Sequence, residues 1–304
     1  MLEKILHHLP TINHSRECCM LNLVTRTWRD MILANSPSAA DRALRMGVAS
    51  WLTIALVGQW IFACYIFIVY AIPVAGGDFA LTRLSHPITG YVESDTMGNV
   101  LYFSHVIPAA ILSMAGVLQI IPALRQQYPV LHRWSGRLFL SLGLCGAIGG
   151  LYLTWGRDSR LSDFGAIGIT LNGLLIPIAV YLAWHYARLR RFAVHRRWAI
   201  QAFLLVNGVW TFRLYLMGWY IINQGPNGNT KQLDGPADIV LSFACYLLPM
   251  AVSGLVFWAE HKKHTILTWG VSGIMMLGSI ITLFGVIAAT FAMWMPPIQA
   301  VLAA

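Results

Sequence analysis

Seven long apolar runs dominate the sequence and limit what the chain can fold into. Each run is about 20 residues or longer and is bounded by Gly, Pro, Asn or clusters of charge. A helix of this length satisfies its own backbone hydrogen bonds in lipid, whereas membrane barrel strands are about ten residues long and alternate in hydropathy. We therefore predict an all-α, polytopic membrane helix bundle. Its seven transmembrane helices are expected near residues 47–72, 100–123, 136–156, 166–187, 199–222, 238–259 and 265–294.

The composition supports this class and excludes others. Only 11% of the residues are charged, against roughly 25% in an average soluble domain. The net charge of +9 does not indicate a nucleic-acid partner, because the Lys and Arg residues lie mainly in short connections between the apolar runs. Two of the five cysteines are adjacent and three lie inside predicted helices, so we expect no disulfide framework. The expected partner is the lipid bilayer.

Charge alternates between the connections and predicts the orientation. Basic residues concentrate before the first run and in the connections at 125–137, 188–197 and 260–264. Acidic residues occupy the other connections, so the positive-inside rule predicts a cytoplasmic N-terminus and an external C-terminus. We expect three parts, namely a cytoplasmic segment at 1–45, a seven-helix domain at 46–295 and a short external tail at 296–304.

A short motif occurs twice where apolar runs begin. "VLHRWSGR" at 130–137 is echoed by "AVHRRWAI" at 193–200, and each histidine follows an arginine by seven residues. Aligning His132 with His195 superposes the hairpin of the second and third runs on that of the fourth and fifth. This predicts a central four-helix unit built from parallel hairpin repeats. The arginines and tryptophans of the motif also suit topology and interfacial anchoring alone.

Four successive runs each carry one histidine, namely His105, His132, His185 and His195. A b-type haem between helices needs two neutral imidazoles at equal depth. At about 1.5 Å per residue, His105 falls roughly 8 Å below the external face and the other three fall near the cytoplasmic face. We expect His132 and His195 to bind one haem b, with His185 as a substitute for either. The hypothesis is a membrane redox component, and metal binding without porphyrin is an alternative.

A second metal hypothesis concerns the N-terminal stretch "HHLPTINHSRECC". Imidazole and thiolate are ligands that Zn²⁺ prefers. The candidate ligands are His7, His8, His14, Cys18 and Cys19.

Arg213, in "WTFRLYLMGW", lies deep inside the fifth run, where a charged residue needs a partner. One interpretation is an internal ion pair with Asp238 or Glu93 that fixes helix packing. The other is an external pocket in which Arg213, His105 and Asn172 bind a carboxylate, a phosphate or a quinone carbonyl. Other polar residues within the runs are expected to form hydrogen bonds between helices. These are Gln59, Gln119, Gln201 and Asn207.

The stretch "FSHVIPAAILSMAGVLQIIPALRQQYPVLHRWSGRLFL", followed by "HRRWAIQAFLLVNGVWTFRLYL", resembles the bacterial predicted-membrane-protein family called domain of unknown function 2306. The resemblance covers roughly residues 50–260. Its motifs map onto His105, Arg125, His132, Arg133, Gly136, Arg137, His195, Arg196, Trp198 and Arg213. Gln201 stands where the family pattern would have a further arginine. The resemblance implies a multi-pass protein of the bacterial inner membrane and supplies no activity.

A looser resemblance is to cytochrome b561-type proteins, which pair histidines across alternate members of four consecutive helices. His132 and His195 fit that pattern, whereas His105 and His185 lie at opposite depths and do not. The functional hypotheses are therefore a haem b redox component that exchanges electrons with a quinone, a binder or transporter of a small anionic or lipid-like ligand, and a structural or assembly factor. No obvious nucleophile or paired-carboxylate motif indicates an enzyme.

Overall fold

The computed structural model describes residues 38–85, 90–119, 122–262 and 264–304, and every regular element in these ranges is helical. The prediction of an all-α bundle is confirmed. Three elements, η2, η4 and η5, are π-helical, and η3 is a 3-10 helix. The elements are α2 (Ala39–Ile66), η2 (Phe67–Ala71), α3 (Ile72–Gly76), η3 (Phe79–Ser85), α4 (Thr96–Leu118), α5 (Pro122–Gln127), α6 (Pro129–Leu151), η4 (Tyr152–Gly156), α7 (Asp163–Arg188), α8 (Phe192–Val206), α9 (Gly208–Ile222), α10 (Pro236–Lys262), α11 (Thr265–Ala289), η5 (Thr290–Trp294) and α12 (Met295–Ala303).

Six helical stretches are long and apolar enough to cross a membrane, and the number is seven if α8 and α9, which are bent by 56° to one another, make one span. Six of the predicted runs correspond to the six stretches, and the fifth run corresponds to the bent pair. The first and last spans are longer than predicted. α2 begins at Ala39, inside the segment assigned to 1–45, and the last span continues to Ala303. Pro296 and Pro297 do not end it, because they lie in the first turn of α12, where proline is tolerated.

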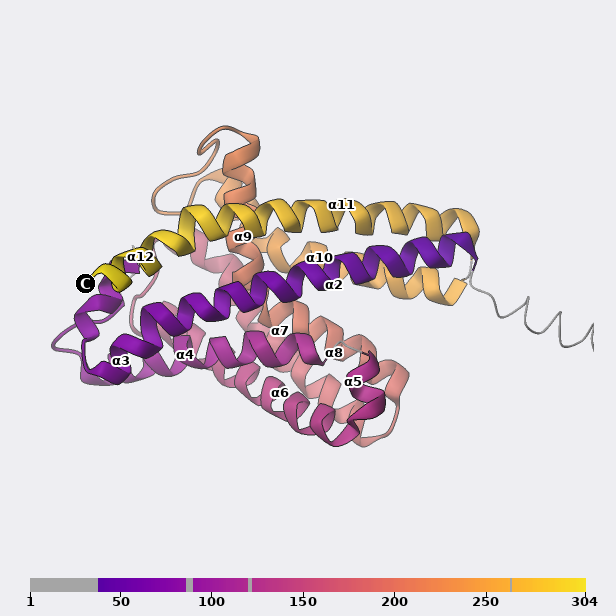
Figure 1. The fold of residues 1–304 in the computed structure, drawn as a ribbon, viewed down its shortest axis with the longest axis horizontal. Helices are drawn as coiled ribbons and strands as arrows, with labels where there is room; N and C mark the ends of the chain where they lie inside the picture. Colours follow the sequence, from indigo (N-terminus) through magenta and orange to yellow (C-terminus); the bar gives the residue numbers. More distant parts are fainter. Residues whose placement is uncertain (1–37, 86–89, 120–121, 263) are drawn as a thin grey trace, which may run out of the picture.

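Two long helices form one side of the molecule (Figure 1). α2 and α11 lie side by side and run in the same direction. α4 packs with α6, and α7 packs with α8, as the two predicted hairpins, and α4 also contacts α2. α9 then turns away from the second hairpin and packs against α10 and α11. The central four-helix unit is therefore completed by only half of the fifth span.

The bend lies at Asn207 and Gly208 and is stabilised by side chains from other helices. Gln59 Nε2 of α2 donates to Asn207 Oδ1 over 2.7 Å, and Asn172 Nδ2 of α7 donates to the Leu205 carbonyl over 3.1 Å. The second bond gives a backbone carbonyl at the bend a side-chain donor, which lipid could not supply. A Cβ at Gly208 would lie 2.6 Å from Asn172 Nδ2, so only glycine allows this approach.

The hydrogen bonds predicted between helices are present. Besides Gln59 with Asn207, Gln201 Nε2 of α8 donates to Ser253 Oγ of α10 over 2.9 Å. The Gln119 amide contacts Ser135 Oγ of α6 at 2.5 Å. We name the two ends of the bundle after one residue at each. The His132 end is where α6 and α8 begin, and the Asp95 end is where α4 begins and α9 ends.

Candidate functional site

Three π-helical segments converge at the Asp95 end. η2, η4 and η5 each continue a long helix there, and they contribute Tyr70, Leu153 and Trp294 to one buried cluster. π-helical turns are rare and occur frequently at functional sites. We use the name polar cluster for the polar residues gathered around this point. They are Tyr65, Tyr70, Tyr102, His105, Arg157, Arg213 and Trp294.

Aromatic rings connect the members of the polar cluster. Trp294 is fully buried, and its ring centroid lies 6.3 Å from that of Tyr65. Tyr65 and Tyr70 meet edge to face at 6.0 Å, with their hydroxyl oxygens 3.5 Å apart. Tyr70 lies 6.3 Å from Tyr102 of α4. The contacts gather three phenol hydroxyls and one indole N–H in the protein interior.

Arg157 covers the polar cluster at the Asp95 end. Its Nε donates to Asp95 Oδ2 and its Nη2 donates to Asn99 Oδ1, both over 2.9 Å. The Arg157 side chain is 6% exposed and that of Asp95 is 39% exposed. Hydrogen bonds from the Gly98 backbone N–H and from Arg157 hold the pKa of Asp95 below its ordinary value. The Arg157 Nη1 is buried and has no hydrogen-bond partner.

Asp238 does not pair with Arg213. It is fully buried at the start of α10, where it accepts hydrogen bonds from Asn229 Nδ2 (2.6 Å), the Thr230 N–H (2.9 Å) and the Gly235 N–H (3.2 Å). Asp238 therefore holds the connection that precedes its own helix. Glu93 is exposed. The interpretation of Arg213 as half of an internal ion pair with either carboxylate is wrong, because each carboxylate has another environment.

Arg213 instead faces aromatic groups and its own helix. Its Nη1 donates to the Val209 carbonyl over 3.1 Å, and its guanidinium carbon lies 5.6 Å from the ring centroid of Phe62 in α2. Within the four described ranges, no carboxylate lies at ion-pair distance from Arg213. The positive charge of Arg213 is therefore not balanced by an acidic side chain of the described chain.

His105 lies in α4 and faces α6. Its ring packs on the α6 backbone, where a Cβ at Gly150 would be 3.2 Å from His105 Cε1, and its Nδ1 is buried without a partner. The charge of Arg213 acts electrostatically on both His105 and Tyr102. Two of the three residues predicted for the external pocket thus share one cluster.

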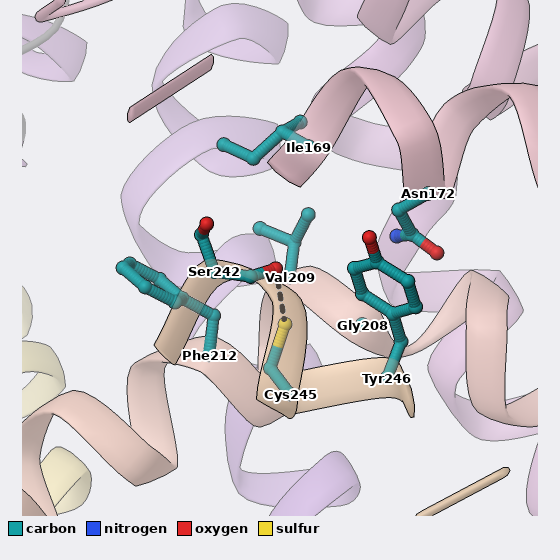
Figure 2. Close-up of a pocket in the computed structure, with 8 residues that line it drawn as sticks. All are labelled: Ile169, Asn172, Gly208, Val209, Phe212, Ser242, Cys245 and Tyr246. Carbon is teal, nitrogen blue, oxygen red and sulfur yellow. Dashed lines mark hydrogen bonds between the residues drawn. The ribbon is translucent and has the colours of Figure 1, made fainter. Parts of the chain in front are cut away.

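Asn172 belongs to the helix break instead. It lines a small pocket with Ile169, Gly208, Val209, Phe212, Ser242, Cys245 and Tyr246 (Figure 2). The pocket volume is about 10 Å³, close to the minimum for one water molecule. The Asn172 Oδ1 is buried without a partner. No hydrogen bond joins Asn172 to Arg213 or His105 in the part of the chain that the structure describes.

A shallow recess of about 220 Å³ opens at the Asp95 end, lined by Gly77, Asp78, Phe79, Ala80, Arg83, Tyr91 and Glu93. The stacked rings of Phe79 and Tyr91 lie 5.9 and 6.4 Å from Phe103. Phe103 contacts Tyr102 at 5.3 Å. Aromatic contacts therefore lead from the recess through Phe103 to Tyr102 of the polar cluster.

The echoed histidines lie near each other at the other end. His132 and His195 are each the fourth residue of their helix, and the two rings lie within electrostatic range of each other. The Nδ1 of His195 donates to the Ala183 carbonyl over 2.8 Å. Gln119, with its amide oriented to satisfy its neighbours, donates to His132 Nδ1 over 3.2 Å. His185 is exposed and stacks on a neighbouring tyrosine.

The metal hypotheses receive no support from side-chain clustering. Across the described ranges, no three His, Cys, Asp or Glu side chains come together as a metal site would require. The N-terminal group of His7, His8, His14, Cys18 and Cys19 lies outside the described residues.

Five members of the polar cluster were not singled out from the sequence. In the sequence, Arg157 is one charge in a connection, and the aromatic members are ordinary apolar residues of helices. The available signal was an arginine directly after an apolar run. The missed residues are Tyr65, Tyr70, Tyr102, Arg157 and Trp294.

The family model described as "Predicted membrane protein (DUF2306)" matches residues 102–257, about half of the chain. The match runs from Tyr102 in α4 to Phe257 in α10 and so includes His105, Arg157 and Arg213. No curated protein and no solved structure matches the chain. The family description supplies a membrane location and no activity. This chain is a multi-pass membrane protein that belongs to the DUF2306 family.

Proposed function

We propose that this protein binds, and moves across or within the bilayer, a small anionic or quinone-like ligand that Arg213 holds in the polar cluster. The observation that carries the proposal is a charged arginine inside a span without a carboxylate partner among the described residues. Arg213 lies about 14 Å from the end of α9 at Ile222. Such a charge costs about 2.5–3.5 kcal/mol near the bilayer centre on insertion scales, so arginines there mark ligand or ion sites.

The surrounding groups favour a ligand that accepts hydrogen bonds. Arg157 Nη1, Trp210 Nε1 and Trp294 Nε1 are buried donors without acceptors. Buried polar groups are normally hydrogen-bonded, and guanidinium groups bind carboxylate and phosphate oxygens with particular strength. The nearby carboxylate of Asp95 already accepts from Arg157. An anion or a quinone carbonyl would satisfy the excess of donors.

Thermal unfolding of the detergent-purified protein tests this proposal. The probes are benzoate, decanoate, inorganic phosphate and a short-chain ubiquinone. A ligand at 100 times its Kd stabilises the native state by about 2.7 kcal/mol, and Arg213→Gln is expected to abolish that gain. Arg45→Gln is the matched control, because Arg45 is exposed near the start of α2, at the other end of the bundle. If no probe stabilises the folded wild type, or Arg213→Gln responds equally, the proposal fails.

The second candidate is the haem b redox component. His195 supports it, because its Nδ1–H donates to Ala183 and leaves Nε2 for an iron, as in proteins whose histidine ligands are fixed from behind. His132 does not fit in the same way. Its Nδ1 accepts from Gln119, which places the ring proton on Nε2. Because only one of the two histidines is oriented as an iron ligand, the haem proposal is the weaker of the two. The resemblance to cytochrome b561-type proteins is weakened for the same reason.

A reduced-minus-oxidised visible spectrum distinguishes the haem proposal. A sharp α-band of the b type, lost in His195→Ala, would support it. A flat spectrum from folded protein expressed with ample haem would overturn it.

Location in a bacterial inner membrane with a cytoplasmic N-terminus is also our proposal. Its support is the concentration of arginines at the His132 end, and the positive-inside rule assigns such an end to the cytoplasm.

A further inference from the structure

His105 is a titratable residue inside a transmembrane helix, and its ring does not use all of its hydrogen-bonding capacity. It lies in α4, and its buried Nδ1 has no partner. α6 presents only backbone at the ring, at Gly146, Gly149 and Gly150. Neither the orientation of the protein in the membrane nor interfacial anchoring requires a histidine at this depth. The property that distinguishes histidine from other residues here is its ability to gain a proton near neutral pH.

The charged and titratable groups around His105 are few. α9 contributes Arg213, whose positive charge acts on the ring, and α6 contributes none. Tyr102 lies on the same helix, and Arg157 after η4 acts on Tyr102. From the α2 side, Tyr65 and Tyr70 reach Tyr102 through the ring contacts. Asp95, the carboxylate of the group, pairs with Arg157.

Two positive charges in a low-dielectric region repel each other, so an imidazolium at His105 needs a negative charge near Arg213. An anion bound to Arg213 provides that negative charge. The ring can then take a proton from water and become an imidazolium that the anion also attracts. Because binding linkage is reciprocal, a group that gains a proton when the anion binds must also make the anion bind more tightly as the pH falls.

We propose that the polar cluster binds its anion together with one proton, which His105 receives. The inference rests on the proposed function and deepens it, because it assigns the ligand class as a monoanion, such as a carboxylate, that is taken up with H⁺. The bound pair carries no net charge, which lowers the cost of holding it inside the bilayer.

Calorimetric titration of benzoate and decanoate into the wild-type protein tests the proposal between about pH 6 and pH 9, where a carboxylate stays ionised. Uptake of one proton predicts an affinity that falls about tenfold per pH unit over the pH range in which His105 is neutral in the unliganded protein and protonated in the complex. Heats measured in buffers of different ionisation enthalpy count the protons directly and need no variant. His105→Gln should keep carboxylate binding and lose its pH dependence.

His261→Gln is the matched control, because His261 is exposed at the end of α10 and should leave the pH dependence intact. Binding without proton uptake in the wild type, or an unchanged pH dependence in His105→Gln, would overturn the inference and leave the proposed anion site standing. Failure of Arg213→Gln to weaken binding would instead overturn the proposed function. The two failures are therefore distinguishable in one set of titrations.

Discussion

Breaking the Gln59–Asn207 hydrogen bond is expected to destabilise the bend in the fifth span. The two side chains are 1% and 4% exposed, and the donor–acceptor distance is 2.7 Å. Gln59→Leu leaves Asn207 Oδ1 without its donor, and Asn207→Ala leaves Gln59 Nε2 without its acceptor. Each single substitution should cost about 1–3 kcal/mol, the usual penalty for a buried polar group that loses its partner.

The coupling between the two substitutions isolates the hydrogen bond itself. Hydrogen bonds between transmembrane helices contribute about 0.6 kcal/mol on average and at most about 1.7 kcal/mol in double-mutant cycles. This bond should approach the upper value, about 1.5 kcal/mol. The reason is that both groups are buried and the partner lies where the backbone ladder is interrupted.

Reversible unfolding in mixed micelles would be measured for the wild type, the two single variants and the double variant. Because α9 carries Arg213 toward Phe62 only after the bend, both single variants should also reduce the stabilisation by bound anion. A coupling energy below about 0.5 kcal/mol would refute the argument that this pair holds the bend.

Three further outcomes are expected. The pKa of Asp95 is lower in the folded protein than in the unfolded chain, where it is about 4. The Asp95 carboxylate therefore stabilises the folded protein above pH about 4, and this contribution is lost as the pH falls through the lower folded pKa. A plot of Tm against pH should show this loss on the acid side, and Asp95→Asn should remove the part that Asp95 contributes. Gly208→Ala should lower stability by about 1–3 kcal/mol through crowding against the bend, whereas Gly218→Ala, with open space at its Cβ, should not. In whole cells, a membrane-impermeant thiol reagent should label Asp234→Cys at the Asp95 end and not Arg133→Cys at the His132 end, and the reverse pattern would contradict the proposed orientation.

The predictions that succeeded concern local or one-dimensional properties. Hydropathy over about 20 residues was sufficient to locate the six spanning helices and the bent pair α8 and α9, and the repeated motif placed His132 and His195 at equivalent positions of α6 and α8. The two histidines lie near each other because each is the fourth residue of a helix that begins at the same end of the bundle. The ion pair of Arg213 with Asp238 failed because depth along a helix does not fix the direction of a side chain. Asp238 points into its own connection and Arg213 points toward Phe62.

The sequence by itself therefore determined the membrane location, the all-helical class and the apolar segments that can span a membrane, because length and apolarity act segment by segment. Only the tertiary structure decided where the fifth span bends and which side chains meet at the Asp95 end. The bend depends on Gln59 and Asn172, which come from other helices. The polar cluster depends on three π-helical turns, whose extra residue per turn rotates side chains away from the ordinary helical register. Contacts between distant segments create both features, and no local pattern of residues encodes them.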